Sequence, residues 1–178
     1  MQSKDELTDN NFAKGDAADI RACLESLPLF SELSGPEIEL LAPLCRLVEG
    51  GTGHYILEEG APVHTIFFLI SGEANVRKEG TVLATVGKGA VLGEMSLLNH
   101  ASAFATIQAK CPFKAIAIEQ SAFARLLEEH ARLGYKIFKK IARLLTLRLM
   151  MTDAKLWECM NIPHDYQHEK DSPTRPSG

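Results

Sequence analysis

Residues 91–106 read VLGEMSLLNHASAFAT, with a Gly–Glu pair at Gly93 and Glu94 directly after two apolar residues. This segment lies within a longer stretch, residues 47–119, that contains nine of the 13 glycines of the chain. Between the glycines stand short runs rich in β-branched and aromatic residues, at residues 54–57, 65–70, 74–77, 82–86, 105–109 and 113–118. Turn residues that return about every 8–12 residues between such runs predict an antiparallel sandwich, jelly roll or barrel.

Helical patterns flank this β-rich stretch on both sides. Apolar spacing over residues 20–27 predicts a short helix, and Ser34–Glu37 has the pattern of a capping box that opens a second one. From residue 121 to about residue 161 the apolar spacing is helical again. The predicted fold class is therefore α+β, mainly β: an antiparallel, jelly-roll-like β-roll flanked by N-terminal helices and a long C-terminal helix.

The chain divides by composition into three parts. Residues 1–19 are polar and acidic, which predicts a flexible leader. Residues 20–161 carry the periodic patterns, which predicts one domain that includes the long helix. Residues 162–178 are polar and end in Pro, Ser and Gly, which predicts a disordered tail.

Composition excludes several classes of protein. The chain has 178 residues, 46% of them apolar, and a net charge of −4, as expected of a globular domain with a core. No apolar run approaches the ~20 residues that a membrane span needs, and no secretion signal is visible, so we expect a cytoplasmic protein.

Cofactor and metal motifs are absent from the sequence. The four cysteines are dispersed, no His-x-His pair occurs, and no nucleophile or phosphate-loop motif is present. We therefore expect no enzyme activity, no metal and no cofactor. A haem or iron–sulfur sensor stays open only if folding gathers the cysteines.

The long C-terminal helix has two apolar rows, and one row needs a partner. We expect a homodimer through paired helices, with Ile141, Leu145, Leu149 and Leu156 at the interface; the alternative is that both rows lie in one intrachain core. Residues 121–160 carry a net charge of +4, which suits a solvated face and, as alternatives, contact with an acidic partner or a nucleic acid.

The order of these motifs resembles the cyclic-nucleotide-binding domain family, which includes CRP/FNR-type bacterial regulators and regulatory subunits of cyclic-AMP-dependent kinase. Residues 29–33 (LFSEL), 58–60 (EEG) and 67–73 (FFLISGE) match its entry and early strands, and residues 91–106 match its phosphate-binding cassette. The resemblance implies that Gly93 allows the backbone to approach a ligand closely and that Glu94 accepts a hydrogen bond from a ribose hydroxyl. It also implies an arginine about nine residues after the glutamate, which holds the cyclic phosphate.

That arginine is missing, because Ala103 stands in its place. Removing one partner of a buried charged pair costs roughly 3–5 kcal/mol, or about 10²–10³-fold in affinity. His100, Arg77 or Lys78 could supply another anion contact. If the pocket functions, the family pattern assigns it Gly93, Glu94, Met95, Ser96, Ala103, Phe104, Ala105 and Thr106, with Thr152 and Asp153 as a lid over the base.

Two functions follow from this comparison. The first is a stand-alone, non-catalytic regulatory domain that does not bind cyclic AMP or cyclic GMP in the usual way and acts through an unknown protein partner or a different ligand. The alternative is a true receptor for a cyclic mononucleotide or cyclic di-GMP with a non-standard anion contact. Only 18 residues follow Met160, too few for a helix-turn-helix domain, so we expect no direct DNA binding.

Overall fold

The computed structural model describes residues 12–13, 16–95 and 102–160. The chain forms two compact units, residues 1–141 and 142–178, and the boundary falls inside the last helix. The sequence had suggested a single domain over residues 20–161. Within the described residues, no helix combines the length and apolar character required to cross a membrane.

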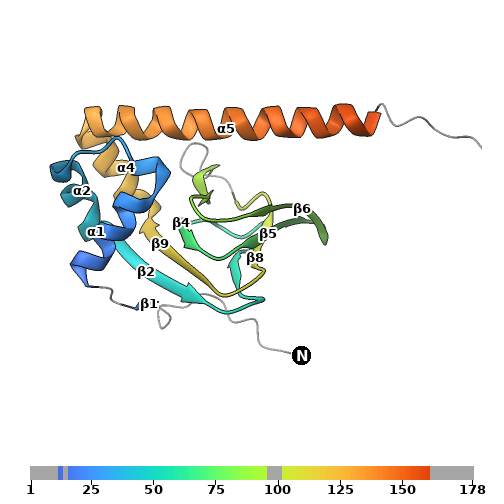
Figure 1. Ribbon diagram of the computed structural model, residues 1–178, viewed down its shortest axis with the longest axis horizontal. Coiled ribbons are helices and arrows are strands. Elements are labelled where there is room, and N and C mark those ends of the chain that lie inside the picture. Colours follow the sequence, from blue (N-terminus) through green and yellow to red (C-terminus); the bar gives the residue numbers. More distant parts are fainter. Residues whose placement is uncertain (1–11, 14–15, 96–101, 161–178) are drawn as a thin grey trace, which may run out of the picture. The chain divides into compact units, whose positions relative to one another are not determined.

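The first unit is built on two antiparallel sheets (Figure 1). One has the strand order β1-β2-β9-β4-β7 and the other β3-β8-β5-β6. The strands are β1 (Phe12–Ala13), β2 (Cys45–Gly50), β3 (Tyr55–Leu57), β4 (Thr65–Ser71), β5 (Ala74–Lys78), β6 (Thr81–Val86), β7 (Val91–Leu92), β8 (Thr106–Ala109) and β9 (Phe113–Glu119). The predicted β-roll with its flanking helices is confirmed.

The helices are α1 (Ala17–Ser26), η2 (Pro28–Phe30), α2 (Gly35–Leu41), η3 (Ala42–Leu44), α4 (Gln120–Glu129) and α5 (Ala131–Met160). Figure 1 shows α1, α2 and α4 gathered at one end of the sheets. Two boundaries differ from the prediction. Phe12 and Ala13 pair with β2 and α1 already begins at Ala17, so part of the predicted leader is structured. The C-terminal helical stretch begins at Gln120 rather than at residue 121, and Glu119 caps α4 because its carboxylate accepts hydrogen bonds from the backbone N–H groups of Ser121 and Ala122.

The core has two layers, one on each face of β9. Residues 115–118 of this strand are all apolar and do not alternate with polar residues. They are fully buried because β9 lies between β2 and β4 and is covered on both faces. Phe113, Ala115 and Ala117 belong to the apolar cluster inside the roll. On β4, Phe68 contacts the rings of Phe30 and Phe123, with centroids 5.1 and 6.1 Å away, and so joins the sheet to the helices.

Gly134 lies inside α5, in its first turns. A Cβ atom at this position would be 2.6 Å from the Leu127 carbonyl oxygen of α4, so a glycine is needed where the two helices touch. The break between α4 and α5 comes earlier, at His130.

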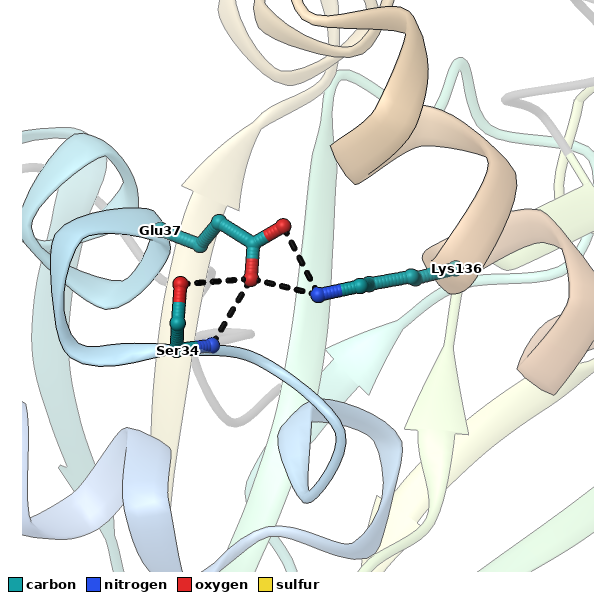
Figure 2. A network of polar contacts seen from close by, with 3 residues as sticks. All are labelled: Ser34, Glu37 and Lys136. Atoms are coloured by element: carbon teal, nitrogen blue, oxygen red, sulfur yellow. Dashed lines mark hydrogen bonds and ion pairs between the residues drawn. The ribbon is translucent and has the colours of Figure 1, made fainter.

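An ionic contact fixes the first turns of α5 against α2 within the first unit (Figure 2). Glu37 closes the predicted capping box by accepting hydrogen bonds from the Ser34 backbone N–H and hydroxyl at 2.7 and 2.8 Å. The same carboxylate accepts hydrogen bonds from Lys136 Nζ at 2.7 and 2.9 Å. One turn further on, Lys140 pairs with Glu32 at 3.0 Å.

This contact makes stability depend on acid pH. The hydrogen bond from Lys136, with those from Ser34, lowers the pKa of Glu37 from 4.5 to about 2. A carboxyl with a lowered folded pKa stabilises the fold above its unfolded pKa, and that contribution is lost as the pH falls from about 4.5 to 2. We predict that Lys136→Met lowers the free energy of unfolding by about 1–2 kcal/mol at pH 7, after allowance for solvent screening, and by less as the pH approaches 2.

Urea unfolding at several pH values measures this effect. Lys139→Met is the matched control. Lys139 lies on the same helix, and its Nζ atom lies 5.8 Å from the centroid of the Tyr135 ring. A loss of stability that is equal for both variants, or independent of pH, would show that Lys136 acts without Glu37.

Candidate ligand site at the Gly–Glu segment

The first half of the site is fixed by β7 and the glycine that follows it. Val91 and Leu92 are buried and pair with Phe68 and Phe67 of β4. Gly93 has φ +81°, and a Cβ atom there would lie 2.9 Å from the Thr65 carbonyl oxygen. The backbone therefore turns tightly against the start of β4, which is possible only without a side chain.

This turn places Glu94 in the interior. Glu94 is 6% exposed and is the one charged residue of the described chain classed as buried. Met95 next to it is half-exposed. Ser96 and His100, both considered as ligand contacts from the sequence, lie outside the described residues. The candidate site therefore has one buried acidic side chain among its described residues.

The second half of the site is held against the turn after β3. The Ala103 N–H donates to the Ala61 carbonyl at 2.9 Å, and the Gly60 N–H donates to the Ala103 carbonyl at 2.8 Å. The Thr106 hydroxyl accepts a bond from the Glu59 N–H at 3.1 Å. Ala105 is buried. Ala103 thus occupies a well-defined backbone position from which it presents only a methyl group.

A lysine from β5 lies beside this position. Lys78 Nζ donates to the Phe104 carbonyl at 2.9 Å, pairs with Glu59 at 2.6 Å and lies 4.7 Å from the centroid of the Phe104 ring. Phe104 is 60% exposed. The hydrogen bond from Lys78, with one from the Glu79 N–H, lowers the pKa of Glu59. Arg77 is engaged elsewhere, because its guanidinium donates to the Gly80 carbonyl at 3.0 Å in the β5–β6 turn.

Lys78 is already paired with the Glu59 carboxylate. An incoming phosphate would have to compete with Glu59 for the lysine. In the described part of the chain, no cluster of three or more His, Cys, Asp or Glu side chains could hold a metal ion. The arrangement can bind hydrogen-bonding groups, and the Glu59–Lys78 pair offers no unshared cation.

Residues 48–130 match the family model "Cyclic nucleotide-binding domain". The chain contains a cyclic nucleotide-binding domain. Glutaminase 1 of Bradyrhizobium diazoefficiens is 34% identical over 134 residues, which cover 75% of this chain and 22% of that protein. The cAMP-dependent protein kinase regulatory subunit of Yarrowia lipolytica is 35% identical over 108 residues, 58% of this chain and 28% of the subunit. The chain thus spans only about a fifth to a quarter of these relatives.

Solved structures agree on the fold. A cyclic nucleotide-binding domain from Methylobacillus flagellatus has a TM-score of 0.73 at 23% identity, with 86% of this chain and 92% of that one covered. The regulatory subunit of a cAMP-independent protein kinase A from Trypanosoma brucei, as a triple mutant bound to cAMP, has a TM-score of 0.62 at 23% identity, with coverage of 73% and 48%.

The predicted site residues are divided between the two units of the chain. Gly93, Glu94, Ala103 and Thr106 all lie in the first unit. Thr152 and Asp153, the predicted lid, belong to the second unit, and their role over a base stays a prediction. Sequence reasoning missed Glu59, because the motif at residues 58–60 indicated only an early strand and its turn.

We predict that Gly93→Ala destabilises the domain by about 2–4 kcal/mol, since it adds a close contact with the Thr65 carbonyl to the cost of a positive φ. Gly53→Ala is the matched control, because Gly53 has φ +84° but nothing within 4 Å of an added Cβ. Urea unfolding measures the free energy of unfolding of both variants, and the difference between their losses gives the cost of the close contact. Equal losses would show that the approach of residue 93 to β4 does not constrain the site.

Proposed function

We propose that this chain is a non-catalytic regulatory domain whose cassette does not hold a cyclic phosphate in the usual way. It acts through contacts with another protein or through a ligand that needs no arginine clamp. The observation that carries the proposal is Ala103, fixed by two backbone hydrogen bonds at the position where the family pattern places the arginine.

The electrostatics of the site support this proposal. A cyclic phosphate gains most from a charge-assisted bidentate pair with a guanidinium. Here the neighbouring cation, Lys78, is shared between Glu59 and the Phe104 carbonyl. The lost pair is worth roughly 3–5 kcal/mol, which would leave a nucleotide messenger bound about 10²–10³-fold more weakly.

The Trypanosoma brucei protein supplies a precedent. It is described as cAMP-independent, and the form bound to cAMP in its A site carries three substitutions, one of which introduces an arginine directly before a Val→Ala change. The corresponding test in this chain is to introduce an arginine at residue 103 and a small residue at 104.

We predict that the wild-type protein gives no heat of binding with cyclic AMP, cyclic GMP or cyclic di-GMP at micromolar concentrations. The double variant Ala103→Arg/Phe104→Ala should gain affinity for a cyclic mononucleotide by about 100-fold or more, because it supplies the guanidinium and places a small residue after it. Isothermal titration calorimetry measures both, with Ala103→Met/Phe104→Ala as a control of similar bulk without the charge. Micromolar binding by the wild type that is lost in Glu94→Gln would contradict the proposal.

A second candidate function rests on Lys78. Its Nζ lies 2.9 Å from the carbonyl of the residue after Ala103, so a phosphate that displaced Glu59 would meet a cation there. On this alternative the chain is a true second-messenger receptor. Wild-type binding that is abolished in Lys78→Met and strengthened in Glu59→Gln would support it, and unchanged binding in Lys78→Met would exclude it.

We also propose that the domain itself is not an enzyme, although two relatives are glutaminases. The chain covers only 20% and 22% of those proteins. Its match to a kinase regulatory subunit, over 108 residues, supports a regulatory part that is shared between otherwise different proteins. The unpaired thiols of Cys23, Cys45 and Cys111 accord with a reducing compartment such as the cytoplasm.

A further inference from the structure

Strand β6 is the longest edge strand of the described sheets. One sheet ends in β1 and β7, and the other ends in β3 and β6. β1 and β7 are two residues long and β3 is three, whereas β6 has six. An edge strand leaves a row of backbone N–H and C=O groups unpaired, and proteins usually keep such edges short. β6 therefore offers a length of open backbone that the other three edges lack.

The side chains of β6 do not block this edge. Its sequence, TVLATV, contains no proline and no charged residue, which are the residues that commonly prevent pairing with another chain. Val82 and Leu83 are 47% and 49% exposed. Leu83 has no partner on β5, because the register shifts there from the pair Val76–Ala84 to the pair Arg77–Val82. This extra residue is a β-bulge in the middle of β6.

The hairpin that carries β6 is held in place without any partner. Glu79 and Gly80 form its two-residue turn, with φ +48° and +82°. The Glu79 N–H donates to the Glu59 carboxylate at 3.1 Å, and the Arg77 guanidinium donates to the Gly80 carbonyl at 3.0 Å. The edge is thus preorganised, so little ordering is needed when another strand pairs with it.

The bulge sets the two halves of β6 so that they match each other. Val82 and Thr85 pair with β5 residues that are two positions apart, so they point to the same face of the sheet. Thr81 and Val86 pair with β5 residues that are four positions apart, so they share the other face. When two copies of β6 run antiparallel about a twofold axis, one full-length register sets Val82 opposite Thr85 and Thr81 opposite Val86, with like faces together.

The same register brings opposite charges together at both ends of the strand. Glu79 lies two residues before β6 and Lys88 two residues after it, and both are exposed. In the antiparallel pair, Glu79 of one copy lies opposite Lys88 of the other, twice by symmetry. A parallel pair would instead set like charges side by side, which is unfavourable. Charge complementarity therefore favours a second copy, running antiparallel, as the partner of this edge.

We propose that β6 pairs antiparallel with β6 of a second copy of this chain, so that their two four-stranded sheets join into one continuous sheet. Leu83 of each copy lies next to the twofold axis, and Glu79–Lys88 pairs close both ends. The contact is made by β6, which contains none of the cassette residues. It therefore does not depend on whether the cassette holds a nucleotide.

This contact is distinct from the paired helices predicted from the sequence, because it uses no residue of α5. That prediction is wrong at one residue: Ile141 is 4% exposed and lies in the core of the first unit, so it is not available to a partner helix. For Leu145, Leu149 and Leu156 it stays a prediction.

Amide hydrogen exchange of the full chain, over about 5 to 500 µM, tests the proposal across the range of a weak dissociation constant. The N–H groups of residues 81–86 that point away from β5 should exchange more slowly at the higher concentrations, because the second copy accepts their hydrogen bonds. Leu83→Lys should raise the dissociation constant by about 10-fold or more, since it places two lysines beside the twofold axis. Leu40→Lys is the matched control, at a leucine of α2 that is 39% exposed.

Charge exchange tests the register. Glu79→Lys and Lys88→Glu should each reduce the protection of residues 81–86, because each variant pairs like charges with itself. An equimolar mixture of the two variants should regain the protection, since the introduced lysine of one copy then meets the introduced glutamate of the other.

Exchange of residues 81–86 in the wild type that does not depend on concentration would overturn the proposal. So would equal protection in Leu83→Lys and Leu40→Lys. A mixture of the two charge variants that stays unprotected would overturn the antiparallel register. Circular dichroism of each variant shows that the fold is kept.

Discussion

The approach of Gly93 to the carbonyl oxygen of Thr65 is the constraint from which the geometry of the site follows. Because β7 is only two residues long and pairs with β4, the chain must turn immediately after it, and a positive φ at a residue without Cβ makes that turn possible. The turn directs Glu94 into the interior, where it is 6% exposed. The chain therefore keeps the scaffold of a nucleotide cassette and a buried carboxylate within it.

Among the described residues of the cassette and its surroundings named here, no cationic side chain is free of other contacts. The far end of the segment is tied to the turn after β3 through Ala103 and Thr106, and the nearby Lys78 is bound to Glu59 and to the Phe104 carbonyl. In the function that we propose, these contacts fix the backbone at the place of the arginine clamp and engage the neighbouring lysine with Glu59. A fold preserved in this way is suited to presenting surfaces, which is why we place the function in protein contacts.

Much of this architecture could be predicted from the sequence because it rests on local patterns. Glycine spacing and β-branched runs indicated the roll, and Ser34 and Glu37 indicated the cap of α2. That position 103 is where the family arginine would stand stays a prediction. Contacts between distant segments could not be predicted. Lys136 bonds to Glu37 across 99 residues, and Lys78 to the carbonyl of Phe104 across 26, and no local pattern encodes either pairing.

The most direct test of the central claim is a titration of the ¹⁵N-labelled wild-type protein with cyclic AMP, cyclic GMP and cyclic di-GMP. The backbone amides of Gly93, Glu94, Ala103 and Thr106 report on both ends of the cassette at once. The account predicts that none of these resonances shifts in a saturable way at micromolar concentrations of any of the three nucleotides. Saturable shifts of these amides with a micromolar midpoint would contradict it and would make this chain a working second-messenger receptor.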